Sequence, residues 1–123
     1  MPIQKSPKNN KFLYWTTKTL LFIINVVYLK ILRRSYDVFI GKVDDYEVDF
    51  VAINNNGRLY VQVADTLKGV DENDTKIFER EIRSLKKIDD NYEKIILTSD
   101  KIPAANEDGI KIYNVLDWLL EKQ

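Results

Sequence analysis

Three alternating segments in a row, each followed by a turn signal, most constrain what this chain can fold into. The segments are residues 36–42, 46–53 and 58–64, and apolar side chains recur in them at every second position, which is the period of a β-strand. Two aspartates at 44–45 separate the first pair, and an Asn-Asn-Asn-Gly run at 54–57 separates the second. Asn and Gly tolerate positive φ angles, so this run favours a tight hairpin. The three segments therefore predict an antiparallel meander.

Helical patterns and shorter strand patterns surround the meander. Residues 16–34 contain no Gly or Pro and are apolar nearly all round, as expected of a helix that packs against a sheet. After the meander we expect a helix, two strands and a helix at residues 72–88, 94–98, 110–113 and 115–121. This order, α-β-β-β-α-β-β-α, predicts an α/β fold with a central mixed sheet flanked by helices.

Some of these expectations are specific to single residues. In the 72–88 helix, Glu81 stands among basic neighbours, which favours a solvent-exposed face with internal ion pairs. In the last helix, Leu116, Leu119 and Leu120 are expected among the core contacts, with Trp118 beside them. Residues 102–109 are expected to form a loop because they lack an apolar period.

Residue types that are missing from the chain exclude several chemistries. There is no cysteine and no histidine. Disulfide scaffolds, thiol nucleophiles, Ser-His catalysis and metal sites with Cys or His ligands are therefore excluded. No GxxxxGK[ST] pattern is present, so we expect no ATP binding by a P-loop. Any catalysis must use carboxylates, lysines, tyrosines, hydroxyls or a metal with oxygen ligands.

Charge is divided unevenly along the chain. The 19 basic and 19 acidic residues balance, yet residues 1–36 contain seven basic residues and no acid. Such a split can mark contact with nucleic acid or a membrane, or it can hold one half of a domain against the other. Residues 1–11 are polar and contain two prolines, which predicts a flexible leader before a single domain at 12–123.

The most apolar stretch, residues 20–29, is short for a membrane span, which needs about 20 apolar residues. Lys18 and Lys30 flank it, and Asn25 lies inside it. It also lacks the small-residue cleavage site that follows the apolar segment of a signal peptide. We therefore expect a buried helix in a cytoplasmic protein. A membrane-anchoring helix over residues 12–32 is the alternative.

The acids of the meander fall in a pattern that bears on function. Asp49 lies on the second predicted strand, and Gln62 and Ala64 lie on the third. Strict alternation places Glu47 on the same face as Asp49, and Val48 on the other. The element order and these places resemble the PD-(D/E)xK nuclease fold. Its active members bind Mg²⁺ through a strand Asp and a Glu or Gln that stands two residues before a Lys.

This pattern is incomplete in the present chain. Ala64 stands where the Lys is needed, and the first helix supplies no acid. Asp49 and Glu47 are candidate ligands for Mg²⁺ or Mn²⁺, which prefer oxygen, and Gln62 is a further vestigial catalytic candidate. The alternative is that Asp49 and Gln62 only satisfy buried hydrogen bonds.

Lys30, Arg33 and Arg34 form a basic cluster at the end of the first predicted helix. Such side chains supply much of the non-specific affinity for nucleic-acid phosphates. They also suit the negative end of a helix dipole without any ligand. Nucleic acid is therefore one candidate partner.

Longer stretches of the chain resemble one family. LRRSYDVFIGK at residues 32–42, EVDFVA at 47–52, YVQVA at 60–64 and an Arg-Glu pair at 80–81 carry the resemblance. They resemble the C-terminal domain of unknown function that follows the ATPase module in many prokaryotic AAA+ superfamily ATPases. The resemblance covers residues 25–120 and implies a restriction-endonuclease-like fold.

The chain departs from that family at acidic positions. The relatives tend to carry Glu where this chain has Ile24 and Lys30. The resemblance therefore implies a degenerate nuclease site in a detached, non-catalytic domain that binds a protein partner such as an AAA+ ATPase. A weak Mg²⁺- or Mn²⁺-dependent nuclease, or a nucleic-acid-binding domain, is the alternative. If partner binding is right, part of the apolar surface of the first helix should remain exposed.

Overall fold

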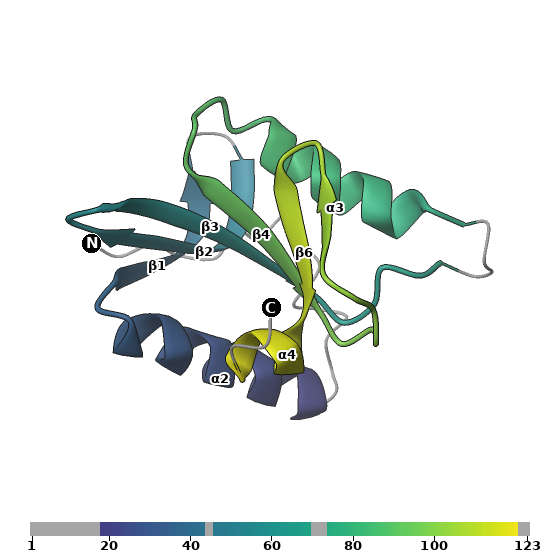
Figure 1. Cartoon of the computed structure of the whole chain (residues 1–123), viewed down its shortest axis with the longest axis horizontal. Coiled ribbons are helices and arrows are strands. Elements are labelled where there is room, and N and C mark those ends of the chain that lie inside the picture. The colour runs from purple at the N-terminus through teal and green to yellow at the C-terminus, as the bar shows by residue number, and fades with distance from the viewer. Residues whose placement is uncertain (1–17, 44–45, 70–73, 121–123) are drawn as a thin grey trace.

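The structure, a computed structural model, describes residues 18–43, 46–69 and 74–120 (Figure 1). The predicted leader at 1–11 lies outside these residues. The described helices are α2 (Lys18–Arg33), α3 (Lys76–Lys86) and α4 (Val115–Leu119). The described strands are β1 (Asp37–Val43), β2 (Tyr46–Asn54), β3 (Gly57–Ala64), β4 (Glu93–Thr98), β5 (Ala105–Glu107) and β6 (Ile110–Asn114).

The strands form one mixed sheet in the order β1-β2-β3-β4-β6-β5. β1, β2 and β3 pair antiparallel, which confirms the predicted meander. β3, β4 and β6 run parallel to one another, and α3 lies in the crossover that a parallel pair requires. α2 and α4 cover one face of the sheet, and α3 covers the other (Figure 1). The predicted α/β fold with a flanked mixed sheet is confirmed.

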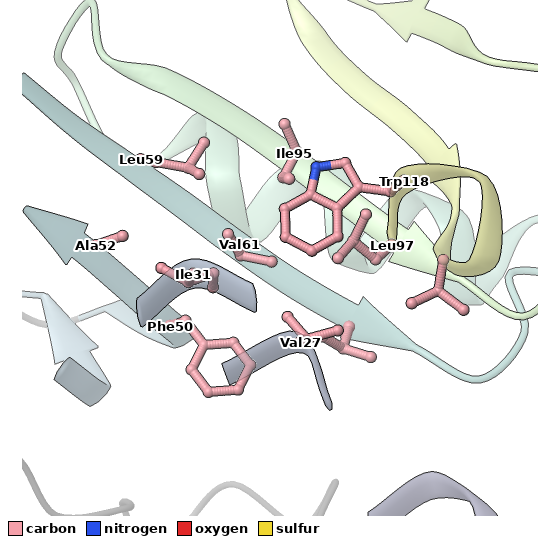
Figure 2. Close-up of a cluster of buried hydrophobic side chains, with 11 residues drawn as sticks. Val27, Ile31, Phe50, Ala52, Leu59, Val61, Ile95, Leu97 and Trp118 are labelled. Carbon is pink, nitrogen blue, oxygen red and sulfur yellow. The ribbon is translucent and has the colours of Figure 1, made fainter. Parts of the chain in front are cut away.

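The first core lies between the sheet and the pair α2 and α4. Val27 and Ile31 of α2 are fully buried, and Trp118 of α4 is nearly so. Figure 2 shows Trp118 lying beside Ile95 and Leu97 of β4. Full burial of a Val or Ile side chain contributes about 1.5–3 kcal/mol of stability relative to an exposed one.

The second core lies on the opposite face, under α3. Ile82 and Leu85 of this helix pack with Tyr60 and Ile96 of the sheet. The helix covers only part of the predicted residues 72–88, since it begins at Lys76 and ends at Lys86. α3 packs against the sheet through a narrow stripe of apolar side chains.

α2 buries one side and exposes the other. Phe22, Leu29 and Leu32 are exposed, in contrast to Val27 and Ile31. The expectation of a buried helix is therefore correct for one side only. None of the helices in the described ranges is long and apolar enough to cross a membrane.

The segment 102–109 contains a strand that the sequence analysis missed. β5 pairs antiparallel with β6, and the turn between them uses Asp108 and Gly109 at φ values of 53° and 87°. These angles suit a two-residue hairpin turn. All three residues of β5 are exposed, so the strand carries no apolar alternation that would reveal it.

The predicted core residues of α4 are confirmed at Trp118 and Leu119, which pack in the first core, and were wrong at Leu116 and Leu120. Leu116 and Leu120 are 58% and 55% exposed, whereas Val115 and Trp118 are buried. α4 starts directly after β6, and the side chain of Asn114 caps it by accepting a hydrogen bond from the Asp117 N–H. This abrupt start fixes which face of so short a helix meets the sheet.

Candidate functional site

An irregularity in β2 sets the geometry of the candidate site. The pairing register between β1 and β2 shifts between Val48 and Val51, so that β2 carries one extra residue there. Val48 consequently packs in the α3 core together with Val51, not with Phe50 as strict alternation predicts. A β-bulge of this kind re-aims the side chain that it contains, here that of Asp49.

Asp49 and Gln62 join β2 to β3 where the backbone pairing ends. The last ladder pair at this end is Phe50 with Val61. Beyond it, the Asp49 N–H donates to Gln62 Oε1 at 2.7 Å, and the Val63 N–H donates to Asp49 Oδ2 at 2.8 Å. The two side chains thus supply the acceptors that a continued ladder would have supplied. Both are buried, with 1% and 5% of their surface exposed.

α3 adds a third polar side chain to this pair. Gln62 Nε2 donates to Glu81 Oε2 at 2.9 Å, and Glu81 is only 2% exposed. The other carboxylate oxygen, Oε1, lies 3.8 Å from Nη2 of Arg80. Asp49, Gln62 and Glu81 therefore form a buried series of hydrogen bonds from β2 through β3 to α3, which we call the polar chain.

The burial of Glu81 overturns the expectation of a solvent-exposed position. Glu81 stands four residues after Ile77 and four before Leu85, and residues at this spacing share one face of a helix. It therefore lies on the apolar stripe of α3, where Gln62 meets it. This spacing was the signal in the sequence that could have identified Glu81.

The remaining candidates of the nuclease pattern are placed as follows. The backbone of Glu47 pairs with Lys42 in the β1–β2 ladder, and its side chain lies outside the described part of the structure. Ala64, at the position of the missing Lys, is 4% exposed and packs in the α3 core. Within the described residues, no three acidic side chains are grouped so that they could hold a metal ion.

The basic cluster lies away from the polar chain. Lys30 and Arg33 stand in the last turn of α2, which packs on the sheet face opposite to α3. The guanidinium of Arg34 lies 4.8 Å from the ring centroid of Trp118, a cation–π distance. The structure thus does not bring these bases together with Asp49 or Gln62.

A second polar cluster ties the loop before β4 to β3. The Tyr60 hydroxyl donates to Asp90 Oδ2 at 2.6 Å and accepts from Arg58 Nη1 at 3.1 Å, and Lys94 Nζ donates to Asp90 Oδ1 at 2.8 Å. Burial and the bond to Asp90 raise the pKa of Tyr60. Burial acts to raise the pKa of Asp90 too, but hydrogen bonds from Lys94, Tyr60 and a backbone N–H outweigh it and lower that pKa.

Comparison with known proteins adds one relative. No protein-family profile matches the chain. An uncharacterized protein of Haemophilus influenzae is 40% identical over 97 residues, which cover 79% of this chain. The chain spans only 22% of the length of that relative, about a fifth. The similar segment therefore belongs to a much longer polypeptide in that species.

Proposed function

We propose that this chain is a non-catalytic, cytoplasmic partner-binding module, a restriction-endonuclease-like domain whose nuclease site is degenerate. The observation that carries the proposal is the bonding of Gln62. Its carbonyl oxygen accepts from the Asp49 N–H, and its amide nitrogen donates to Glu81. An amide that is held at both ends by protein groups acts as a link between elements of the fold.

The arrangement of the elements supports the same proposal. A helix, an antiparallel meander, a crossover helix and a strand parallel to β3 follow one another. This is the order that the resemblance to the PD-(D/E)xK nuclease fold implies. The long Haemophilus relative supports it too, since a matched segment of 22% leaves ample chain for other modules.

Ala64 argues against hydrolysis by this chain. A nuclease of this pattern uses a metal ion and a lysine to polarise the phosphate and to help generate hydroxide. Ala64 has no group for this task and is buried in the α3 core. We therefore expect no cleavage of DNA or RNA.

A weak Mg²⁺- or Mn²⁺-dependent nuclease is the second candidate, because hydrogen bonds link Asp49, Gln62 and Glu81, three residues with oxygen-bearing side chains, in one buried place. An Ala64→Lys variant tests it. If the rest of a site survives, this variant should cleave a plasmid in the presence of Mn²⁺, and the same variant with Asp49→Asn should not. The degenerate-site proposal expects no cleavage by either variant.

The partner-binding surface that we propose is the outer side of α2 and α4. Five of its apolar side chains are 39–68% exposed. They are Phe22, Leu29, Leu32, Leu116 and Leu120, and we call this set the α2–α4 surface. The two helices contact each other on one face of the sheet (Figure 1). Large exposed apolar patches on soluble domains mark interaction sites, and we propose that these side chains belong to one.

Charge narrows the kind of partner. α2 contains no acid and carries Lys30 and Arg33 in its last turn. A partner segment with apolar side chains and acidic neighbours would therefore complement it. The resemblance suggests that this segment belongs to an AAA+ ATPase that is supplied by another chain.

The test is copurification with matched surface variants. Tagged wild-type chain should recover a P-loop ATPase, identified by mass spectrometry, and a double variant with Leu29→Glu and Leu116→Glu should not. Tyr92→Glu is the control, since Tyr92 is also exposed, at 47%, but lies outside the α2–α4 surface. Absence of any ATPase with wild type, or equal recovery with the double variant, would contradict the proposal.

A further inference from the structure

A cavity of about 660 Å³ lies between the start of α3 and the β5–β6 hairpin. Phe78 of α3 forms one wall, and Ala105 and Ile112 of the hairpin form the opposite wall. Leu67 and Ile102 also line it. Cavities of roughly 300–1,000 Å³ with apolar walls are typical of small-molecule sites.

The position of the cavity in the sheet is also typical of ligand sites. β3 and β4 run parallel, and β3 ends at Ala64 and β4 at Thr98. Leu67 and Asp100, which line the cavity, stand in the loops that follow these two ends. In open α/β sheets, ligands bind outside the carboxyl ends of parallel strands. The cavity thus combines a suitable shape with the usual place.

The polar groups around the cavity are mainly acidic. Asp74, Asp100 and Glu107 line it, against the single base Lys68. Asp100 is held in place, because its carboxylate accepts hydrogen bonds from the Thr66 hydroxyl and the Leu67 N–H, both at 2.8 Å. A carboxylate has room for further donors. The excess of carboxylates favours a positively charged group at this rim.

We propose that this cavity binds a small apolar molecule with a cationic end, such as an alkyl or aryl ammonium compound. The apolar part lies between Phe78 and Ile112, and the ammonium group lies toward Asp100 and Glu107. The proposal does not depend on partner binding, because the α2–α4 surface lies on the opposite face of the sheet from α3.

The experiment uses n-decylammonium as the probe and decanoate as its charge-reversed match. Amide chemical shifts of the full chain are followed by NMR during each titration. Decylammonium should bind saturably, with the largest shifts at Ala105, Glu107 and Ile112. Decanoate should bind about tenfold more weakly or not at all.

Two neighbouring alanines supply matched variants. Ala105 lines the cavity and Ala104 does not, and both are exposed. Ala105→Phe fills the cavity from an exposed strand position, which tolerates aromatic residues, and should weaken decylammonium binding about tenfold or more. Ala104→Phe should leave it unchanged, and Glu107→Gln should weaken it. No saturable binding, equal binding of decanoate, or equal loss in both alanine variants would overturn the proposal.

Discussion

Gln62 is the residue at which three elements of the fold meet. It accepts from the backbone of β2 and donates to α3, while its own backbone lies in β3. The sequence placed Asp49 and Gln62 on two predicted strands that a tight turn joins, and the structure brings them into a hydrogen bond. Glu81 was missed because its charge and basic neighbours favour solvent exposure. Its place on the apolar stripe of α3 instead buries it, where Gln62 donates a hydrogen bond to it.

Replacement of Gln62 by Glu should destabilise the protein at neutral pH. The new carboxylate would face the carboxylate of Glu81, since Gln62 Nε2 now donates to it at 2.9 Å. The loss of this donor in a buried place should lower the free energy of unfolding by about 2–4 kcal/mol. At lower pH, protonation of one of the two carboxylates would restore a hydrogen-bond donor between them. The decrease in the free energy of unfolding should therefore be smaller at lower pH.

Urea denaturation at pH 7 and pH 5 measures both effects. Asn55→Asp is the matched control, because it makes the same change of amide to carboxylate at an exposed turn position. Wild-type stability of Gln62→Glu at pH 7 would show that the polar chain does not hold the fold together.

Asp90 should contribute stability that is lost in acid. Its pKa is lowered in the folded state by hydrogen bonds from Lys94 and Tyr60, which outweigh the effect of burial. Its contribution is therefore complete at neutral pH and disappears as the pH falls below about 4, through the folded pKa. Asp90→Asn should lower the free energy of unfolding at pH 7 by about 1–3 kcal/mol.

The measurement is denaturant unfolding of wild type and Asp90→Asn from pH 7 down to pH 3. The gap between the two should narrow on acidification. Asp89→Asn, at an exposed neighbouring position, should match wild type throughout. A gap that is constant with pH would mean that the ionised carboxylate of Asp90 is not what stabilises the loop.

The helices and strands that depend on nearby residues were predicted from the sequence. Those that depend on contacts with distant parts of the chain were not. The meander follows from alternation and from an Asn-Gly turn, which are both visible within a few residues. The bulge at Asp49 and the strand β5 depend on the strand next to them in the sheet. The same holds for part of α4: Leu116 and Leu120 were predicted in the core and are exposed, whereas Trp118 is buried as predicted.

The two faces of α4 should therefore respond differently to truncation. Trp118→Ala removes a side chain that is 2% exposed in the first core and should cost about 3–5 kcal/mol. Leu116→Ala removes one that is 58% exposed and should cost less than about 0.5 kcal/mol. Thermal unfolding of both variants checks this. Equal losses, or a larger loss for Leu116→Ala, would contradict the observed orientation of α4.

In the whole molecule, the sheet separates the polar chain from the surface that we propose for partner binding. The polar chain lies on the α3 side, and the α2–α4 surface lies on the other (Figure 1). The proposed partner binding at α2 and α4 would therefore need no contact with Asp49 or Gln62.

We propose that the polar chain is a structural element and not a metal site. Its most direct test is a calorimetric titration of Mg²⁺, and then of Mn²⁺, into wild type and into Asp49→Asn. We predict no saturable binding to either protein. Binding at micromolar concentration by wild type that disappears in Asp49→Asn would contradict the claim and would favour a surviving nuclease site.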